Sequence, residues 1–100
     1  MSTHRLPPPE RKQLILDAAI AAALEHGFGR FTREHVGLAA GVGPSLVNKY
    51  FTTMTQLRRA VIGAAIHNEV LQLIREGIVL RDSRALQVSN ELKQKAMGAA

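Results

Sequence analysis

The segment TREHVGLAAGVGPSLVNKYF, residues 32–51, limits the fold of this chain more than any other part. It has the pattern of two short helices joined at Gly41, because glycine enters the left-handed conformation of a tight turn at little steric cost. Thr32 suits the N-cap of the first helix, and Pro44 suits the first position of the second. A helix as short as 44–51 cannot stabilise a fold alone, so the pattern predicts a helix-turn-helix held by a larger scaffold.

The flanking segments have the helical periodicity expected of that scaffold. Residues 10–26 carry an apolar stripe at helical spacing and end before Gly27, which favours a first helix there. Thr53 and Gln56 have capping-box spacing, which predicts a long fourth helix over residues 54–76 that Gly77 ends. Weaker patterns at 82–86 and 89–97 predict a short helical tail. With no useful β alternation, the fold class is predicted to be all-α.

The predicted fourth helix is apolar on two sides, whereas a surface helix needs only one such stripe. The first stripe is Leu57, Val61, Ala64, Asn68 and Leu71. The second would leave an exposed patch of a size that monomers rarely tolerate. We therefore predict a homodimer interface on the second stripe, with cover by the C-terminal tail as the alternative for part of it. This predicted interface consists of Ile62, Ile66, Val70 and Leu73.

The net charge of +5 is unevenly distributed over the 100 residues. Residues 1–60 hold eight of the thirteen Lys and Arg residues but four of the eight acids. A polyanion such as DNA would be attracted to this basic half, with affinity that falls as salt rises. A basic surface without a partner is an equally good interpretation of the charge alone.

Several functional classes find no support in the residues. The chain has no Cys, and its histidines have no metal-ligand spacing, so we expect no metal site and no cofactor. The acids are scattered and no Ser has an evident base partner, so we expect no catalytic residues and no enzyme activity. No apolar run is long enough to cross a bilayer and no secretory leader is visible, which favours a cytoplasmic protein without a membrane partner.

The helix predicted over 44–51 has an outer face suited to the DNA major groove. At about 100° per residue, Ser45 and Lys49 lie opposite Val47. Asn can bond adenine, Lys can donate to guanine, and Leu46 could pack on a thymine methyl group. Helix N-termini and nearby hydroxyl groups suit phosphates. The predicted DNA-binding residues are Thr32, Arg33, Pro44, Ser45, Leu46, Asn48, Lys49, Tyr50 and Thr53.

The organisation we predict is a flexible arm (1–9), a helix-turn-helix domain (10–53) and a dimerising helical region (54–100). The arm places Arg5 ahead of a stiff proline run, and such arms can enter the minor groove. A terminus that touches nothing is the alternative.

A set of residues, in a fixed order along the chain, is shared with a known protein family. The set is Ile15-Leu16-Asp17-Ala18-Ala19, Gly27-Phe28, Thr32, Val36, Ala40-Gly41-Val42, Tyr50-Phe51 and Leu57. Over residues 10–60 it resembles the N-terminal DNA-binding domain of TetR-type repressors. The resemblance implies a homeodomain-like, three-helix helix-turn-helix, a homodimer on a palindromic double-stranded operator, and repression of transcription at the bacterial nucleoid.

The chain departs from the family pattern at Gly43, Asn48 and Met54, where Ser, Tyr and Lys are usual. These departures leave open a rival interpretation, a small protein-interaction module (an anti-activator or adaptor) that has lost DNA recognition. Only residues 61–100 follow the resemblance, whereas family members normally add a large ligand-binding domain. We therefore expect no small-molecule ligand and an autoregulatory short form, of the sort that plasmids and phages use.

Overall fold

All regular structure in the described part of the chain is helical. The computed structural model describes residues 8–98, which contain seven helices and no strand. They are α1 (Pro8–His26), α2 (Arg33–Ala40), α3 (Pro44–Tyr50), α4 (Met54–His67), α5 (Leu71–Val79), α6 (Ser83–Leu86) and α7 (Asn90–Gly98). The predicted all-α class is confirmed.

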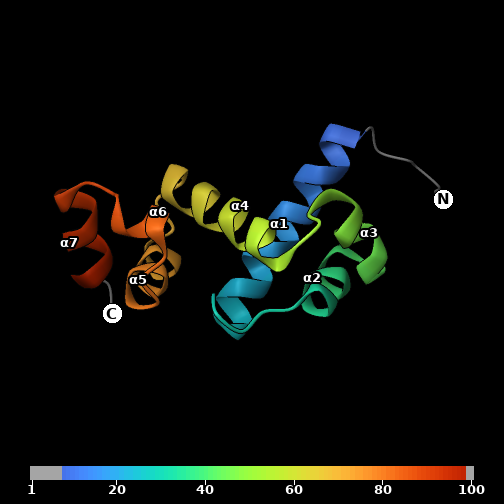
Figure 1. Cartoon of the computed structure of the whole chain (residues 1–100), viewed down its shortest axis with the longest axis horizontal. Coiled ribbons are helices and arrows are strands. Elements are labelled where there is room, and N and C mark those ends of the chain that lie inside the picture. Colours follow the sequence, from blue (N-terminus) through green and yellow to red (C-terminus); the bar gives the residue numbers. More distant parts are fainter. Residues whose placement is uncertain (1–7, 99–100) are drawn as a thin grey trace.

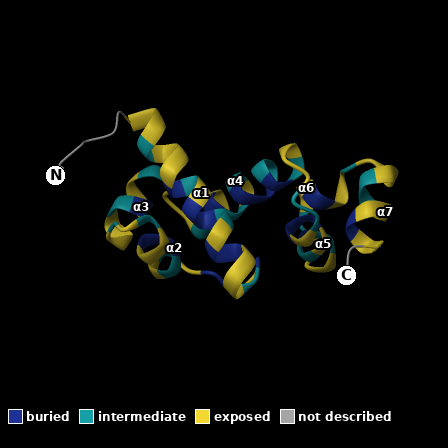
Figure 2. Ribbon diagram, turned by 180° about the vertical axis from the view of Figure 1, so that it is seen from behind, coloured by how far each residue is buried: buried dark blue, intermediate teal, exposed yellow. Residues whose placement is uncertain are grey.

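The helices form an elongated body of 46 × 22 × 21 Å, with α2 and α3 toward one end and α7 at the other (Figure 1). Helix α1 packs against α2 and α4, and α5 packs against α4, α6 and α7. Figure 2 shows the buried residues concentrated where α1 and α4 face their neighbours. The largest fully buried side chains are Phe31, Ile15, Leu57, Ile62, Leu73, Ile74, Val36, Val47 and Val61.

Helix α1 begins at Pro8, two residues before the predicted start at Glu10. Prolines are compatible with a first helical turn, because their φ angle is already near the helical value and the missing N–H has no partner there. The predicted arm therefore loses its last two residues to the helix. The remaining arm residues, including Arg5, lie outside the described residues.

The long helix predicted over residues 54–76 is two helices, α4 and α5, separated by a break at residues 68–70. Glu69 adopts φ +53°, Val70 N–H donates to Ala65 O at 2.8 Å, and Glu69 N–H donates to Ile66 O at 3.3 Å. This is the Schellman pattern of helix termination, with Glu in the position that glycine usually occupies. The prediction failed here because the sequence has no Gly or Pro at the break.

Gly77, predicted to end the fourth helix, lies inside α5. A Cβ at this position would come within 2.8 Å of Ala85 Cβ and 2.9 Å of Ile62 Cδ1. The glycine therefore permits close packing of α5 on α4 and α6. Helix α5 ends after Val79, where Arg81 has φ +61° and Asp82 N–H donates to Gly77 O at 2.8 Å.

The second apolar stripe packs largely within the chain's own core, which corrects its description as a bare dimer surface. Ile62 and Leu73 are fully buried, and Ile66 and Val70 are half-buried against the same core. The break after α4 explains the difference, because it lets α5 fold back onto α4. Gly77 of α5 lies against Ile62, so this burial comes from α5, which was predicted as part of the long helix, and not from the C-terminal tail alone.

A hydrogen bond ties the connection between α1 and α2 to α5. Phe28 N–H donates to Glu76 Oε1 at 2.7 Å, and Gln72 Nε2 donates to the other carboxylate oxygen at 3.2 Å. Leu80 also covers this connection, since a Cβ on Gly29 would lie 2.9 Å from Leu80 Cδ1. The region after α4 therefore supports the loop from which α2 begins.

We expect Glu76→Ala to lower the free energy of unfolding by roughly 1–3 kcal/mol, because it leaves the partly buried Phe28 N–H without its acceptor. Glu76→Gln keeps a side-chain oxygen and should lose less. Urea denaturation followed by circular dichroism measures both variants. Equal stability of Glu76→Ala and the unaltered protein would show that this bond contributes nothing.

Candidate nucleic-acid interface

Helix α2 begins with a capping box formed by Thr32 and His35. His35 N–H donates to Thr32 Oγ1 at 3.2 Å, and Thr32 N–H donates to His35 Nδ1 at 3.1 Å. The His35 ring also stacks on His26 from the end of α1, with centroids 3.6 Å apart and an interplanar angle of 8°. The predicted cap at Thr32 is confirmed, and its partner His35 fixes the start of α2 against α1.

The turn between α2 and α3 depends on two glycines. Gly41 has φ +74°, the left-handed conformation predicted for it. Val42 N–H donates to Gly37 O at 2.9 Å, and a Cβ on Gly37 would lie only 2.6 Å from Val42 O. Since that neighbour is backbone, the turn can pass this close to α2 only where the side chain is absent.

Helix α3 is anchored on one side and open on the other. Val47 and Phe51 are buried, whereas Ser45, Asn48 and Lys49 are exposed. Pro44 lies in the first turn of the helix. Gly43 is the N-cap, and it has no side chain to form a capping hydrogen bond. Three exposed polar side chains are thus presented on the face that the sequence predicted.

The other predicted contact residues differ in their exposure and in their hydrogen bonds. Leu46 and Tyr50 are half-buried against the core, and Pro44 is exposed. Thr32 and Thr53 are exposed, but their hydroxyl groups accept backbone bonds as N-caps, Thr53 from Gln56 N–H at 3.0 Å. These two threonines therefore fix the starts of α2 and α4.

Arg33 has a structural partner that the sequence did not indicate. Its Nη2 donates to Thr52 O at 3.2 Å, across from α2 to the connection between α3 and α4. The residue is half-buried, and its Nε is a buried atom without a hydrogen bond. Arg33 therefore helps to hold the two ends of the helix-turn-helix together.

Lys12, which is not among the predicted contact residues, places a cation near the end of α3. Its Nζ lies 5.4 Å from the centroid of the Phe51 ring, directly after α3. Lys49 Nζ lies 6.0 Å from the Tyr50 ring on α3 itself. The contact joins residues far apart in the sequence, so local sequence patterns do not predict it. The helical repeat of α1 indicates only which face of that helix carries Lys12.

Residues 8–98 lack the features of two other kinds of site. No group of three or more His, Cys, Asp or Glu side chains there could hold a metal ion. No helix in this part of the chain is long and apolar enough to cross a membrane.

Comparison with known proteins identifies the region that contains this surface. Residues 15–61 match the family model of bacterial regulatory proteins, tetR family. The match begins within α1 and ends within α4, so it includes the helix-turn-helix of α2 and α3. The chain matches no curated protein and no solved structure.

We expect Gly37→Ala to destabilise the chain by roughly 1–3 kcal/mol, because the added Cβ would overlap Val42 O. Gly43→Ser is a matched control, since a Cβ at Gly43 meets only Ser45 Oγ at 3.9 Å. Thermal unfolding compares the two variants. Equal midpoint temperatures of unfolding would show that the backbone of the turn can shift at little cost, so that its close approach to α2 does not require glycine.

Proposed function

Residues 15–61 form a DNA-binding domain of the TetR family of transcriptional regulators, and from this premise we propose that the chain is a sequence-specific repressor. It binds a palindromic operator as a homodimer and regulates its own gene in the bacterial cytoplasm. The domain belongs to a family of regulators, not of enzymes.

The exposed face of α3 is the observation that supports sequence-specific binding. Ser45, Asn48 and Lys49 are exposed, while Val47 on the opposite side is buried. An amide side chain can pair with adenine in the major groove, and an ammonium group can donate to guanine. The half-buried Leu46 at the edge of this face offers an apolar contact for a thymine methyl group.

Contacts to the DNA backbone would come from the residues around α3. The exposed Thr32 lies at the N-terminus of α2, where backbone N–H groups and the helix dipole favour a phosphate. Lys12 adds a cation beside Phe51. The proposed contacts to the DNA backbone are completed by Arg33, Pro44, Tyr50 and Thr53. Arg33 also supports the fold, because it donates to Thr52 O.

We expect Asn48→Ala and Lys49→Ala each to cost roughly 1–3 kcal/mol of operator binding while leaving the fold intact. Operator fragments are first selected from a random DNA library, and affinities are then measured by mobility shift at fixed salt. Gln13→Ala is the control, because Gln13 is exposed on α1 and bonds Asp17 rather than any part of α3.

Unchanged affinity in both α3 variants would contradict the assignment of the reading face. The unaltered protein should also bind bulk DNA with a steep salt dependence. Absence of both bulk and selected DNA binding would favour the rival interpretation, a protein-interaction module.

A homodimer fits this function, since two copies can occupy the two half-sites of a palindrome. With Ile62 and Leu73 buried, the exposed apolar residues at the end of α5 are the better contact for a second copy. Val79 is 64% exposed and Leu80 is 55% exposed. They border an open groove of about 450 Å³ that reaches Phe28. We therefore propose that this end of α5 extends the dimer contact beyond Ile66 and Val70.

We expect sedimentation equilibrium to find a dimer that Val79→Asp converts to a monomer, because a charge at the contact would lose its water on pairing. Leu38→Asp is the matched control, since Leu38 is 82% exposed on α2, outside the proposed contact. A monomer at all micromolar concentrations would contradict the homodimer. A dimer that both variants preserve would place the contact elsewhere.

A further inference from the structure

A concave site between α4 and α6 gathers three arginines outside the α3 surface. The hollow has a volume of about 290 Å³. Its lining residues are Thr55, Arg58, Arg59, Asp82, Ser83 and Arg84. Helix α6 lies in the half of the molecule away from α3 (Figure 1). The hollow is therefore a feature separate from the proposed DNA-reading face.

The helical repeat and one glycine explain why the arginines meet. Thr55, Arg58 and Arg59 share a face of α4, because residues three and four apart lie on the same side of a helix. Arg84 reaches across from α6, and its Nη1 donates to Arg59 O at 3.1 Å.

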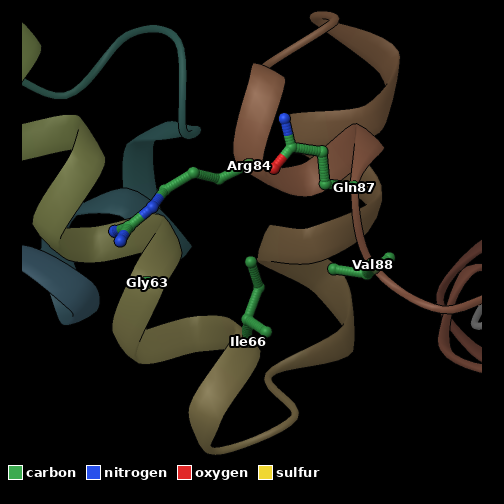
Figure 3. Close-up of a pocket in the computed structure, with 5 residues that line it drawn as sticks. All are labelled: Gly63, Ile66, Arg84, Gln87 and Val88. Carbon is green, nitrogen blue, oxygen red and sulfur yellow. The ribbon is translucent and has the colours of Figure 1, made fainter.

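Gly63 makes room for this crossing arginine. A Cβ at Gly63 would lie 2.6 Å from Arg84 Nη1, so the guanidinium group rests where a side chain would otherwise be. Figure 3 shows the Arg84 side chain extended over α4 beside Gly63. The hollow is thus formed by a specific contact between the two helices.

The positive charge of the hollow is not neutralised within the described residues. None of its three arginines forms an ion pair with a carboxylate in residues 8–98. Arg58 Nε is a buried atom without a hydrogen bond. The one carboxylate of the lining, Asp82, caps α6 by accepting from Arg84 N–H at 2.9 Å and Ala85 N–H at 3.1 Å. Three arginines that line one hollow without forming an ion pair are expected to favour a bound anion there.

We propose that this hollow binds the phosphate group of a small phosphorylated molecule. Guanidinium groups present forked donors that match phosphate oxygens, and the hydroxyl groups of Thr55 and Ser83 can donate as well. The few residues that follow the family resemblance led us to expect no small-molecule ligand, whereas three arginines without an ion pair in the described residues point to one.

A second hollow on the other side of Arg84 offers space for the remainder of that molecule. It measures about 280 Å³. Gly63, Ile66, Gln87 and Val88 line it together with Arg84 (Figure 3). Its apolar side chains and its one amide suit an uncharged organic group. A phosphate on Arg84 could therefore carry a substituent over the face of α4 beside Ile66.

Titration with inorganic phosphate tests the charged part of the site. Arginine side-chain resonances are followed by NMR at constant ionic strength, with sodium chloride as the matched titrant. We expect saturable shifts of Arg58, Arg59 and Arg84 with phosphate and none with chloride. Arg84→Gln and Arg59→Gln should each weaken binding about tenfold or more, because each removes a charged donor. Arg59→Gln keeps the backbone carbonyl that Arg84 uses, so it serves if Arg84→Gln misfolds.

Arg30→Gln is the control, since it removes the same charge from a residue that lines a different groove. It should change phosphate binding less than twofold. Phosphate shifts that never saturate, or an equal loss in Arg30→Gln, would overturn the proposal in favour of a general basic surface. A loss of DNA affinity in Arg59→Gln without any phosphate binding would also overturn it, because the arginines would then contact the DNA backbone.

Discussion

Burial of Val47 and Phe51 is the interaction on which the proposed reading face depends. Both side chains enter the core shared with α1 and α4, so the short α3 cannot rotate about its axis without exposing them. Helix α3 spans only Pro44–Tyr50 and has no side-chain N-cap bond, so its own hydrogen bonds would not keep it folded in water. The direction of Asn48 and Lys49 is therefore a consequence of hydrophobic packing on the opposite side.

The residues after the family match contribute to the same rigidity. Glu76 holds the backbone of the α1–α2 connection, and Leu80 packs over Gly29 in that connection. The connection leads directly to Thr32, whose capping box with His35 starts α2. A change in the position of α5 can therefore alter the helix-turn-helix through the Glu76–Phe28 hydrogen bond and the short segment from Phe28 to Thr32. The domain and its extension are expected to unfold together.

Features of the helix-turn-helix that depend on neighbouring residues could be predicted from the sequence, whereas features that depend on contacts between distant residues could not. The caps at Thr32 and Thr53 and the left-handed Gly41 each follow from a few neighbouring residues, and the structure confirms them. The break at Glu69 requires a left-handed non-glycine residue, which costs about 1–2 kcal/mol and has no sequence signature. The contact of Lys12 with Phe51 depends on the tertiary fold, so no short window of the sequence contains it.

The break after α4 also determines which apolar side chains are buried within one chain and which stay exposed. One continuous helix would have kept Ile62 and Leu73 on an outer stripe, available to a second copy. Because α5 folds back, these two side chains stabilise the single chain instead. A domain of this size buries a modest fraction of its surface, so using its best apolar residues internally is the more stable arrangement. The proposed homodimer would then rely on apolar residues that the fold leaves exposed, and Val79 and Leu80 are neighbouring residues of that kind.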